Sequence, residues 1–139
     1  MEKRVKRVKR EYVRESEHFM WTELECMCGK VDCQGNGMDI RFMEKLEVMR
    51  VAYGKPMILT SGERCILHPI EAAKRNPGAH ERGCAVDIKY GTGRNLRELI
   101  GLAVTLDFEG IAMERSFLHL DCYANLPGRK GENFMSWVY

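Results

Sequence analysis

Two stretches of the chain place apolar residues at the spacing of an amphipathic helix. In the first stretch the apolar positions are Phe42, Leu46, Met49 and Tyr53. In the second stretch they are Leu96, Leu99, Ile100, Ala103 and Leu106. Gly54 and Pro56 follow the first stretch and are typical helix terminators. The pattern therefore predicts one helix over residues 40–53 and another over residues 96–106.

A shorter helix is predicted at residues 22–25. The sequence Thr22-Glu23-Leu24-Glu25 has the form of a capping box, in which a Thr hydroxyl and a Glu carboxylate bind free amides at the helix start. The glycines between residues 29 and 37 then predict a loop.

Four short apolar runs predict strands. They cover residues 57–60, 84–88, 110–113 and 117–121. The run at 57–60 is expected to be a buried strand. The connection between the last two runs is too short for a crossover helix, which favours antiparallel pairing. The pattern predicts an α+β fold, a single compact domain with a small antiparallel sheet flanked by helices.

Length and composition agree with one globular domain. Of the 139 residues 45% are hydrophobic, and 22 basic residues face 20 acidic ones. Seven of the basic residues lie in the first 15, so we divide the chain into a basic leader, residues 1–15, and a domain, residues 16–139. The leader is expected either to be solvated and poorly ordered or to approach an anionic surface.

The sequence also indicates where the protein is made and what it does not bind. It contains neither an apolar run of the roughly 20 residues that cross a bilayer nor the apolar stretch of a secretory signal. We therefore expect a protein made in the cytoplasm, without a transmembrane segment. A monomer is also expected. Because aromatic residues do not interleave with the basic leader and no readout motif is present, nucleic acid is not an expected partner.

Six cysteines in a chain without an export signal are expected to be reduced. Cys26, Cys28 and Cys33 are clustered, but their spacing lacks the paired Cys-x2-Cys pattern of common structural zinc sites. A second, structural metal site there would need a fourth ligand such as Cys65. The other two cysteines lie in apolar stretches and are expected to be buried thiols.

Two histidines and a carboxylate offer a set of metal donors. Because side chains alternate along a strand, Asp87 faces away from its apolar neighbours, and His119 shares a face with Asp121. His80, Asp87 and His119 together make the three protein ligands of a catalytic zinc. Asp121 is placed to take a proton from water or to orient a ligand. On spacing alone, a buried histidine paired with a structural aspartate is an equal alternative.

Three ordered motifs link these residues to a known family. They are Ser61-Gly62-Glu63-Arg64-Cys65, His80-x2-Gly83-x-Ala85-x-Asp87-Ile88 and Phe117-x-His119-x-Asp121. In identity and spacing they resemble the motifs of the M15 peptidases, which are zinc D-Ala-D-Ala carboxypeptidases and phage cell-wall endopeptidases. The resemblance runs from about Phe19 to the C-terminal Trp137-Val138-Tyr139. The Cys-rich turn after Phe19 is similar to that of small phage-encoded members.

The resemblance implies a fold like that of Hedgehog and DD-peptidase domains, and one catalytic zinc held by His80, Asp87 and His119. It implies that Arg64 grips a carboxylate or carbonyl of the substrate, a role suited to a bidentate guanidinium, with Ser61 of the same motif beside it. His68 either lines the cleft or caps the following helix.

The catalytic acid or base has two candidates, Asp121 and Glu114. Asp121 is favoured because it shares a strand face with His119. Several branches of the family place the acid three residues before the last His, where this chain has Ser116.

Two further departures concern the substrate pocket. Glu63 replaces the usual Tyr, and Ala79 replaces the usual Ser. We expect these changes to alter the pocket wall beside Arg64 and the loop before His80, and hence the substrate preference.

The sequence thus predicts a zinc-dependent peptidase that hydrolyses a bond in the stem peptide or cross-bridge of peptidoglycan. The bond itself, D-Ala-D-Ala, L-Ala-D-Glu or a cross-bridge, stays open. Such a protein is expected to be a phage endolysin that reaches the wall after holin-type release, or a virion-associated lysin. The alternative is a catalytically inactive zinc module of the same fold that binds the cell wall or has a structural role.

Overall fold

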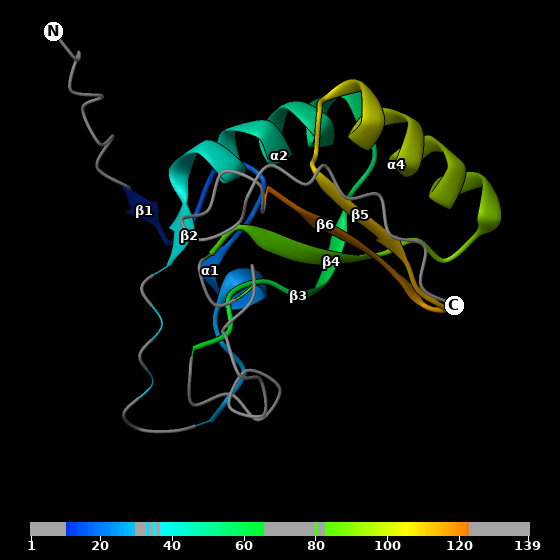
Figure 1. The fold of residues 1–139 in the computed structure, drawn as a ribbon. Coiled ribbons are helices and arrows are strands. Elements are labelled where there is room, and N and C mark those ends of the chain that lie inside the picture. Colours follow the sequence, from blue (N-terminus) through cyan, green and yellow to red (C-terminus); the bar gives the residue numbers. More distant parts are fainter. Residues whose placement is uncertain are drawn as a thin grey trace, which may run out of the picture.

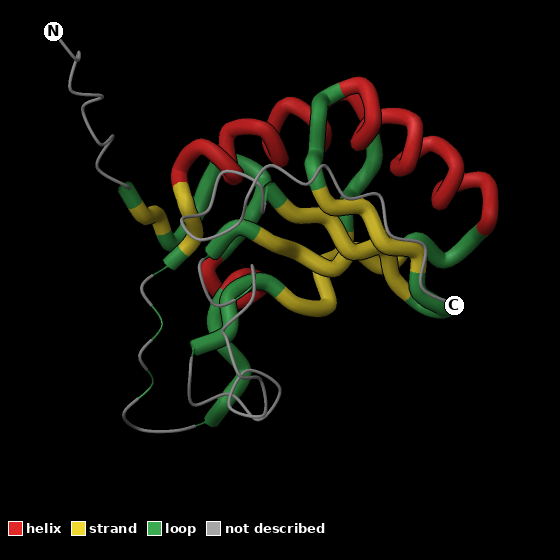
Figure 2. Tube along the Cα trace, in the orientation of Figure 1, coloured by secondary structure: helices red, strands yellow, loops and turns green. Residues whose placement is uncertain are grey.

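The computed structural model describes residues 11–29, 33, 35, 37–65, 80 and 83–122. Figure 1 shows the ribbon, and Figure 2 gives the same view by secondary structure. In chain order the elements are β1 (Tyr12–Val13), α1 (Trp21–Leu24), β2 (Met38–Asp39), α2 (Ile40–Tyr53), β3 (Ile58–Ser61), β4 (Ala85–Lys89), α4 (Gly93–Thr105), β5 (Gly110–Met113) and β6 (Phe117–Asp121). This mixture of helices and strands confirms the predicted α+β class. Within these ranges, the helices lack the length and apolar character needed to cross a lipid bilayer.

Four of the strands form an antiparallel sheet in the order β3-β4-β6-β5. β5 and β6 form a hairpin, which confirms the antiparallel pairing expected from their short connection. The prediction that the run at 57–60 is a buried strand is wrong. Ile58 is 58% exposed, because β3 lies at the edge of the sheet and pairs within it with β4 alone.

A second, two-stranded sheet joins β1 to β2, with Tyr12 opposite Asp39 and Val13 opposite Met38. The described fold therefore includes residues 12 and 13, which the sequence assigns to the end of the basic leader. Residues 1–10 of that leader lie outside the described residues.

Side-chain caps set the starts of the two long helices. The Asp39 carboxylate accepts hydrogen bonds from the amides of Arg41 at 2.9 Å and Phe42 at 3.2 Å, and α2 ends before Gly54, as predicted. α4 begins three residues earlier than predicted. The reason is the Thr92 hydroxyl, which accepts from the Asn95 amide at 3.1 Å and caps the helix there.

The short helix α1 begins at Trp21, one residue earlier than predicted. The predicted capping box of Thr22 and Glu25 is wrong, since Glu25 already lies beyond the last helical residue. Instead, the Glu23 carboxylate accepts a hydrogen bond from the Met20 amide at 3.0 Å. The capping interaction has the expected chemistry but is shifted along the chain.

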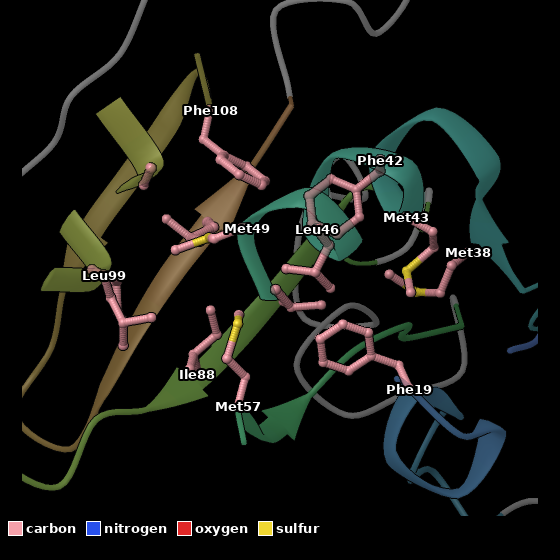
Figure 3. Packing of buried hydrophobic residues seen from close by; sticks show 14 of the residues in the cluster. Phe19, Met38, Phe42, Met43, Leu46, Met49, Met57, Ile88, Leu99 and Phe108 are labelled. Carbon is pink, nitrogen blue, oxygen red and sulfur yellow. The ribbon is translucent and has the colours of Figure 1, made fainter. Parts of the chain in front are cut away.

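The core lies between the sheet and its two long helices. Figure 1 shows α2 and α4 on the same side of the sheet. Figure 3 shows buried side chains of both helices, Leu46 and Leu99 among them, in one cluster with Ile88 of β4. The rings of Phe42 and Phe108 pack edge to face, with centroids 5.8 Å apart. The inward residues of β4 and β6 are Val86, Ile88, Leu118 and Leu120, all fully buried. The residues that alternate with them face the opposite side of the sheet.

Candidate metal centre

The sheet presents the candidate residues on the face away from the helices. β4 and β6 pair so that Asp87 lies opposite His119 and Ala85 lies opposite Asp121. Directly opposed residues of an antiparallel pair share a face, so Asp87, His119 and Asp121 lie together on this side. The apolar residues between them anchor both strands in the core and thereby fix the position of the polar ones.

His80 is brought to the same place by the chain that follows β3. Its Nδ1 lies 2.6 Å from the carbonyl oxygen of Gly62, and its own carbonyl accepts from the Arg64 amide at 3.0 Å. Gly62 sits so close to α1 that a side chain there would come within 2.7 Å of the Leu24 carbonyl oxygen. A ring that donates from Nδ1 to a carbonyl keeps Nε2 as the atom that can bind a metal. Here Nε2 lies 3.2 Å from Asp87 Oδ1.

Three donor atoms meet at one point. Asp87 Oδ1 lies 3.2 Å from His80 Nε2 and 3.0 Å from His119 Nδ1, and the two nitrogens are 3.2 Å apart. Ligands that bind a tetrahedral zinc ion at about 2.0–2.1 Å lie about 3.3–3.4 Å from one another, close to these separations. The set of two imidazoles and one carboxylate therefore fits a zinc ion and leaves one position for a ligand from outside the protein.

Asp87 carries its negative charge in a buried place, where it is only 3% exposed. Burial by itself would raise its pKa, but hydrogen bonds with His119 and His80 hold the pKa of this carboxyl well below its usual range. Arg64 Nη2 donates to the other carboxylate oxygen, Oδ2, at 3.2 Å. Arg64, which is expected to grip substrate, therefore contacts Asp87 in this structure.

His119 is held through both of its ring nitrogens. Nδ1 faces Asp87, while Nε2 lies 2.7 Å from Asp121 Oδ2. Burial alone would lower the pKa of His119, but its hydrogen bonds with Asp121 and Asp87 raise the pKa to about 9. When the ring is neutral with its proton on Nε2, that N–H donates a hydrogen bond to Asp121 and the lone pair of Nδ1 is left to bind a metal. Asp121 thus has the position of a carboxylate that orients a metal-binding histidine.

Gly110 is a positioning residue that the sequence analysis missed. It lies opposite Asp121 in the β5–β6 pair, and a Cβ at this position would collide with the Asp121 carboxylate. The predicted hairpin contained the signal, because its register sets Gly110 directly across from Asp121, the aspartate of the last motif.

Glu114, the other candidate for proton transfer, lies at the turn of the same hairpin. Its amide donates to the Phe117 carbonyl oxygen at 3.0 Å, and its carbonyl accepts from the Tyr90 hydroxyl at 2.7 Å. Across the described ranges, no hydrogen bond joins its carboxylate to His80 or Asp87. β5 ends at Met113, so Glu114 lies one residue beyond the strand and two residues after Ala112, which is opposite His119.

The remaining predicted residues have different outcomes. Ser61 aligns with Asp87 after a β-bulge, in which one extra residue of β3 shifts the register. Glu63, which is expected to alter the pocket wall beside Arg64, is buried. It is 2% exposed, and its carboxylate accepts from the Gly37 amide at 2.9 Å, because a buried carboxylate needs donors. His68, Ala79 and the C-terminal residues 137–139 lie outside the described residues.

Comparison with known proteins agrees with this geometry. The family model described as Peptidase M15 matches residues 17–121, which include all three motifs. A search of curated proteins finds no match to the chain. The matched region contains β3, β4 and the β5–β6 hairpin, and with them every donor of the candidate centre. The chain belongs to the M15 family of peptidases.

Proposed function

We propose that this peptidase is zinc-dependent and hydrolyses a peptide bond in bacterial peptidoglycan. The observation that carries the proposal is the cluster of His80 Nε2, Asp87 Oδ1 and His119 Nδ1, whose separations of 3.0–3.2 Å suit the ligands of one zinc ion. The general zinc dependence of M15 peptidases supports the same metal.

A zinc ion at this site would supply a Lewis acid that polarises the scissile carbonyl and lowers the pKa of water toward roughly 7. The protein's own contribution is to hold the three donors in place. Each has a partner on its far side: Gly62 for His80, Arg64 for Asp87 and Asp121 for His119. Such partners fix ring orientation and ligand basicity, so the site is organised before the metal binds.

Two carboxylates, Asp121 and Glu114, are the candidates for proton transfer that the sequence names. Asp121 is engaged with His119 Nε2, on the side of the ring away from Asp87, which supports a positioning role. We therefore assign proton transfer to Glu114. Its half-buried side chain and its place at the hairpin turn, two residues after the Ala112 that is opposite His119, support this assignment.

The substrate class rests on the family and on the motifs. The peptidase activity follows from family membership. The resemblance of the three motifs to those of cell-wall enzymes supports a bond in the stem peptide or cross-bridge of peptidoglycan. The similarity of the Cys-rich turn to small phage-encoded members supports a role as an endolysin or a virion-associated lysin.

Purified peptidoglycan tests the proposal directly. The protein is incubated with sacculi, and newly formed amino groups are labelled and counted. We expect release that stops when a chelator removes the metal, returns with added zinc and is absent in His119→Ala. Glu44→Gln, an exposed carboxylate on α2, is the control and should hydrolyse like the wild type. Hydrolysis that is unaffected by metal removal would disprove the zinc mechanism.

The same experiment separates the enzyme from its alternative. A zinc-loaded wild-type protein that binds sacculi but releases no amino groups from any wall preparation would support the catalytically inactive module instead.

A further inference from the structure

Four cysteines from separate parts of the chain meet in a second group of possible metal donors. Cys26 and Cys28 follow α1, Cys33 lies in the loop beyond, and Cys65 follows β3. Their sulfur atoms all lie within 4.8 Å of one another. The sequence analysis grouped the first three and considered Cys65 as a fourth ligand, and the fold brings Cys65 to them.

The distances within this group suit a metal rather than a disulfide. Cys65 Sγ lies 3.6 Å from Cys28 Sγ. Sulfur ligands about 2.3 Å from a tetrahedral zinc ion lie about 3.8 Å apart, whereas bonded sulfurs of a disulfide are only about 2.05 Å apart. The Cys65 amide also donates to Cys26 Sγ at 3.2 Å, an interaction that stabilises negative charge on a thiolate.

We propose that Cys26, Cys28, Cys33 and Cys65 bind a structural zinc ion. The four thiols release their protons to solvent as the metal binds, and no change of oxidation state is involved. Because all four ligands come from the protein, the site has no open position for substrate, which distinguishes it from the centre at His80.

The position of this site suggests what it does for the fold. It fastens the loop after α1 to residue 65, directly beside the segment that holds His80. In that segment the Gly62 carbonyl holds the His80 ring, the Arg64 amide holds the His80 carbonyl, and the Glu63 amide donates to Leu24 at 2.9 Å. A metal here would join the loop after α1 to the end of β3. None of its four cysteine ligands belongs to the hydrophobic core, so the metal would stabilise a part of the fold that the core does not.

The Glu63 carboxylate supports the same loop from the other side. It accepts from the Gly37 amide and lies so close to Gly35 that a Cβ there would come within 2.9 Å of it. The loop that carries Cys33 is therefore anchored next to Cys65, and this anchor accounts for a buried acid at position 63.

Zinc content after removal of loosely bound metal tests the proposal. We expect two zinc ions per wild-type chain, one in Cys28→Ser and one in His119→Ala. Cys122→Ser is the matched control, since it removes a thiol outside the group and should keep both ions. Equal zinc content in Cys28→Ser and wild type would overturn the proposal, and so would a disulfide among the four cysteines of freshly purified protein.

The absorption spectrum of the cobalt-substituted protein tests the proposal even if Cys28→Ser does not fold. In cobalt-substituted wild type and His119→Ala, thiolate ligands give an intense sulfur-to-cobalt charge-transfer band in the near ultraviolet. We expect that band in both proteins, and its absence from both would overturn the proposal. These measurements do not depend on wall hydrolysis, so a failure of the proposed enzymatic function would leave them unchanged.

Discussion

The Asp121 carboxylate occupies space that only a glycine at position 110 leaves open. Gly110→Ala would push this carboxylate away from His119 Nε2, because the added Cβ collides with it. Loss of an outer partner of a metal-binding histidine typically weakens metal affinity about 10–100-fold. We expect a loss of that size in Gly110→Ala, measured by competition with a chromophoric chelator.

Gly101→Ala provides the control for this substitution. Gly101 lies in α4, and a Cβ there would meet nothing within 4 Å. This variant should keep wild-type zinc affinity and gain up to about 1 kcal/mol of stability from the better helix propensity of alanine. If Gly110→Ala binds zinc as tightly as Gly101→Ala, Asp121 does not orient His119.

Asp121 and Glu114 are expected to respond differently to amide substitution. Asp121→Asn should weaken zinc binding, because the partner of His119 Nε2 loses its charge. Glu114→Gln should keep full zinc affinity while kcat falls by roughly 10²–10⁴-fold, as for the loss of a residue that transfers a proton. Zinc titration and kcat measured on both variants decide between the roles. An active Glu114→Gln together with an inactive, zinc-loaded Asp121→Asn would reverse the assignment.

At the scale of elements, α2 is tied to the chain before α1 by one carboxylate. Glu47 accepts from the Ser16 hydroxyl and from the His18 amide at 2.8 Å, and it lies 2.6 Å from His18 Nδ1. Burial by itself would raise the pKa of Glu47, but these hydrogen bonds and the charge of His18 bring it below its ordinary 4.5. The contact therefore stabilises the fold only while Glu47 is ionised.

The pH dependence of stability tests this contact. Because the pKa of Glu47 is lower in the folded chain, its contribution is complete above about 4.5 and is lost as the pH falls through the folded-state value. We expect Glu47→Gln to be less stable than wild type at pH 7, with the difference shrinking in acid, as measured by urea unfolding. Glu44→Gln, exposed on the same helix, should show no such pH dependence. A constant difference for Glu47→Gln at every pH would contradict the account.

The elements show how far the sequence pattern reaches. The helix predicted from about residue 40 to 53 is confirmed, because the apolar spacing and the Gly54 terminator are both local signals. The exposure of the run at 57–60 could not be predicted from its sequence. An edge strand and a central strand can have the same apolar sequence and differ only in their neighbours. The capping residue of α1 differs from the prediction for a similar reason. Either Glu23 or Glu25 could cap the helix until the path of the chain before the helix is known.

At the scale of the whole molecule, the sequence identified the metal donors and Asp121 beside His119, but not the partners of the other donors. Motif spacing was enough to name His80, Asp87 and His119, which the fold brings together. The contact of Arg64 with Asp87 and the turn of Glu63 toward Gly37 depend on side-chain directions and on long-range packing, which no local pattern encodes. The meeting of Cys65 with Cys26 likewise depends on how the loop after α1 folds back onto the end of β3.

Zinc-edge anomalous diffraction from crystals grown with zinc tests the central claim most directly. We predict a peak bonded at about 2.0–2.1 Å to His80 Nε2, Asp87 Oδ1 and His119 Nδ1, with His119 Nε2 still on Asp121. A zinc-bound protein with no peak among these three atoms, or with His119 turned away from Asp87, would contradict the account.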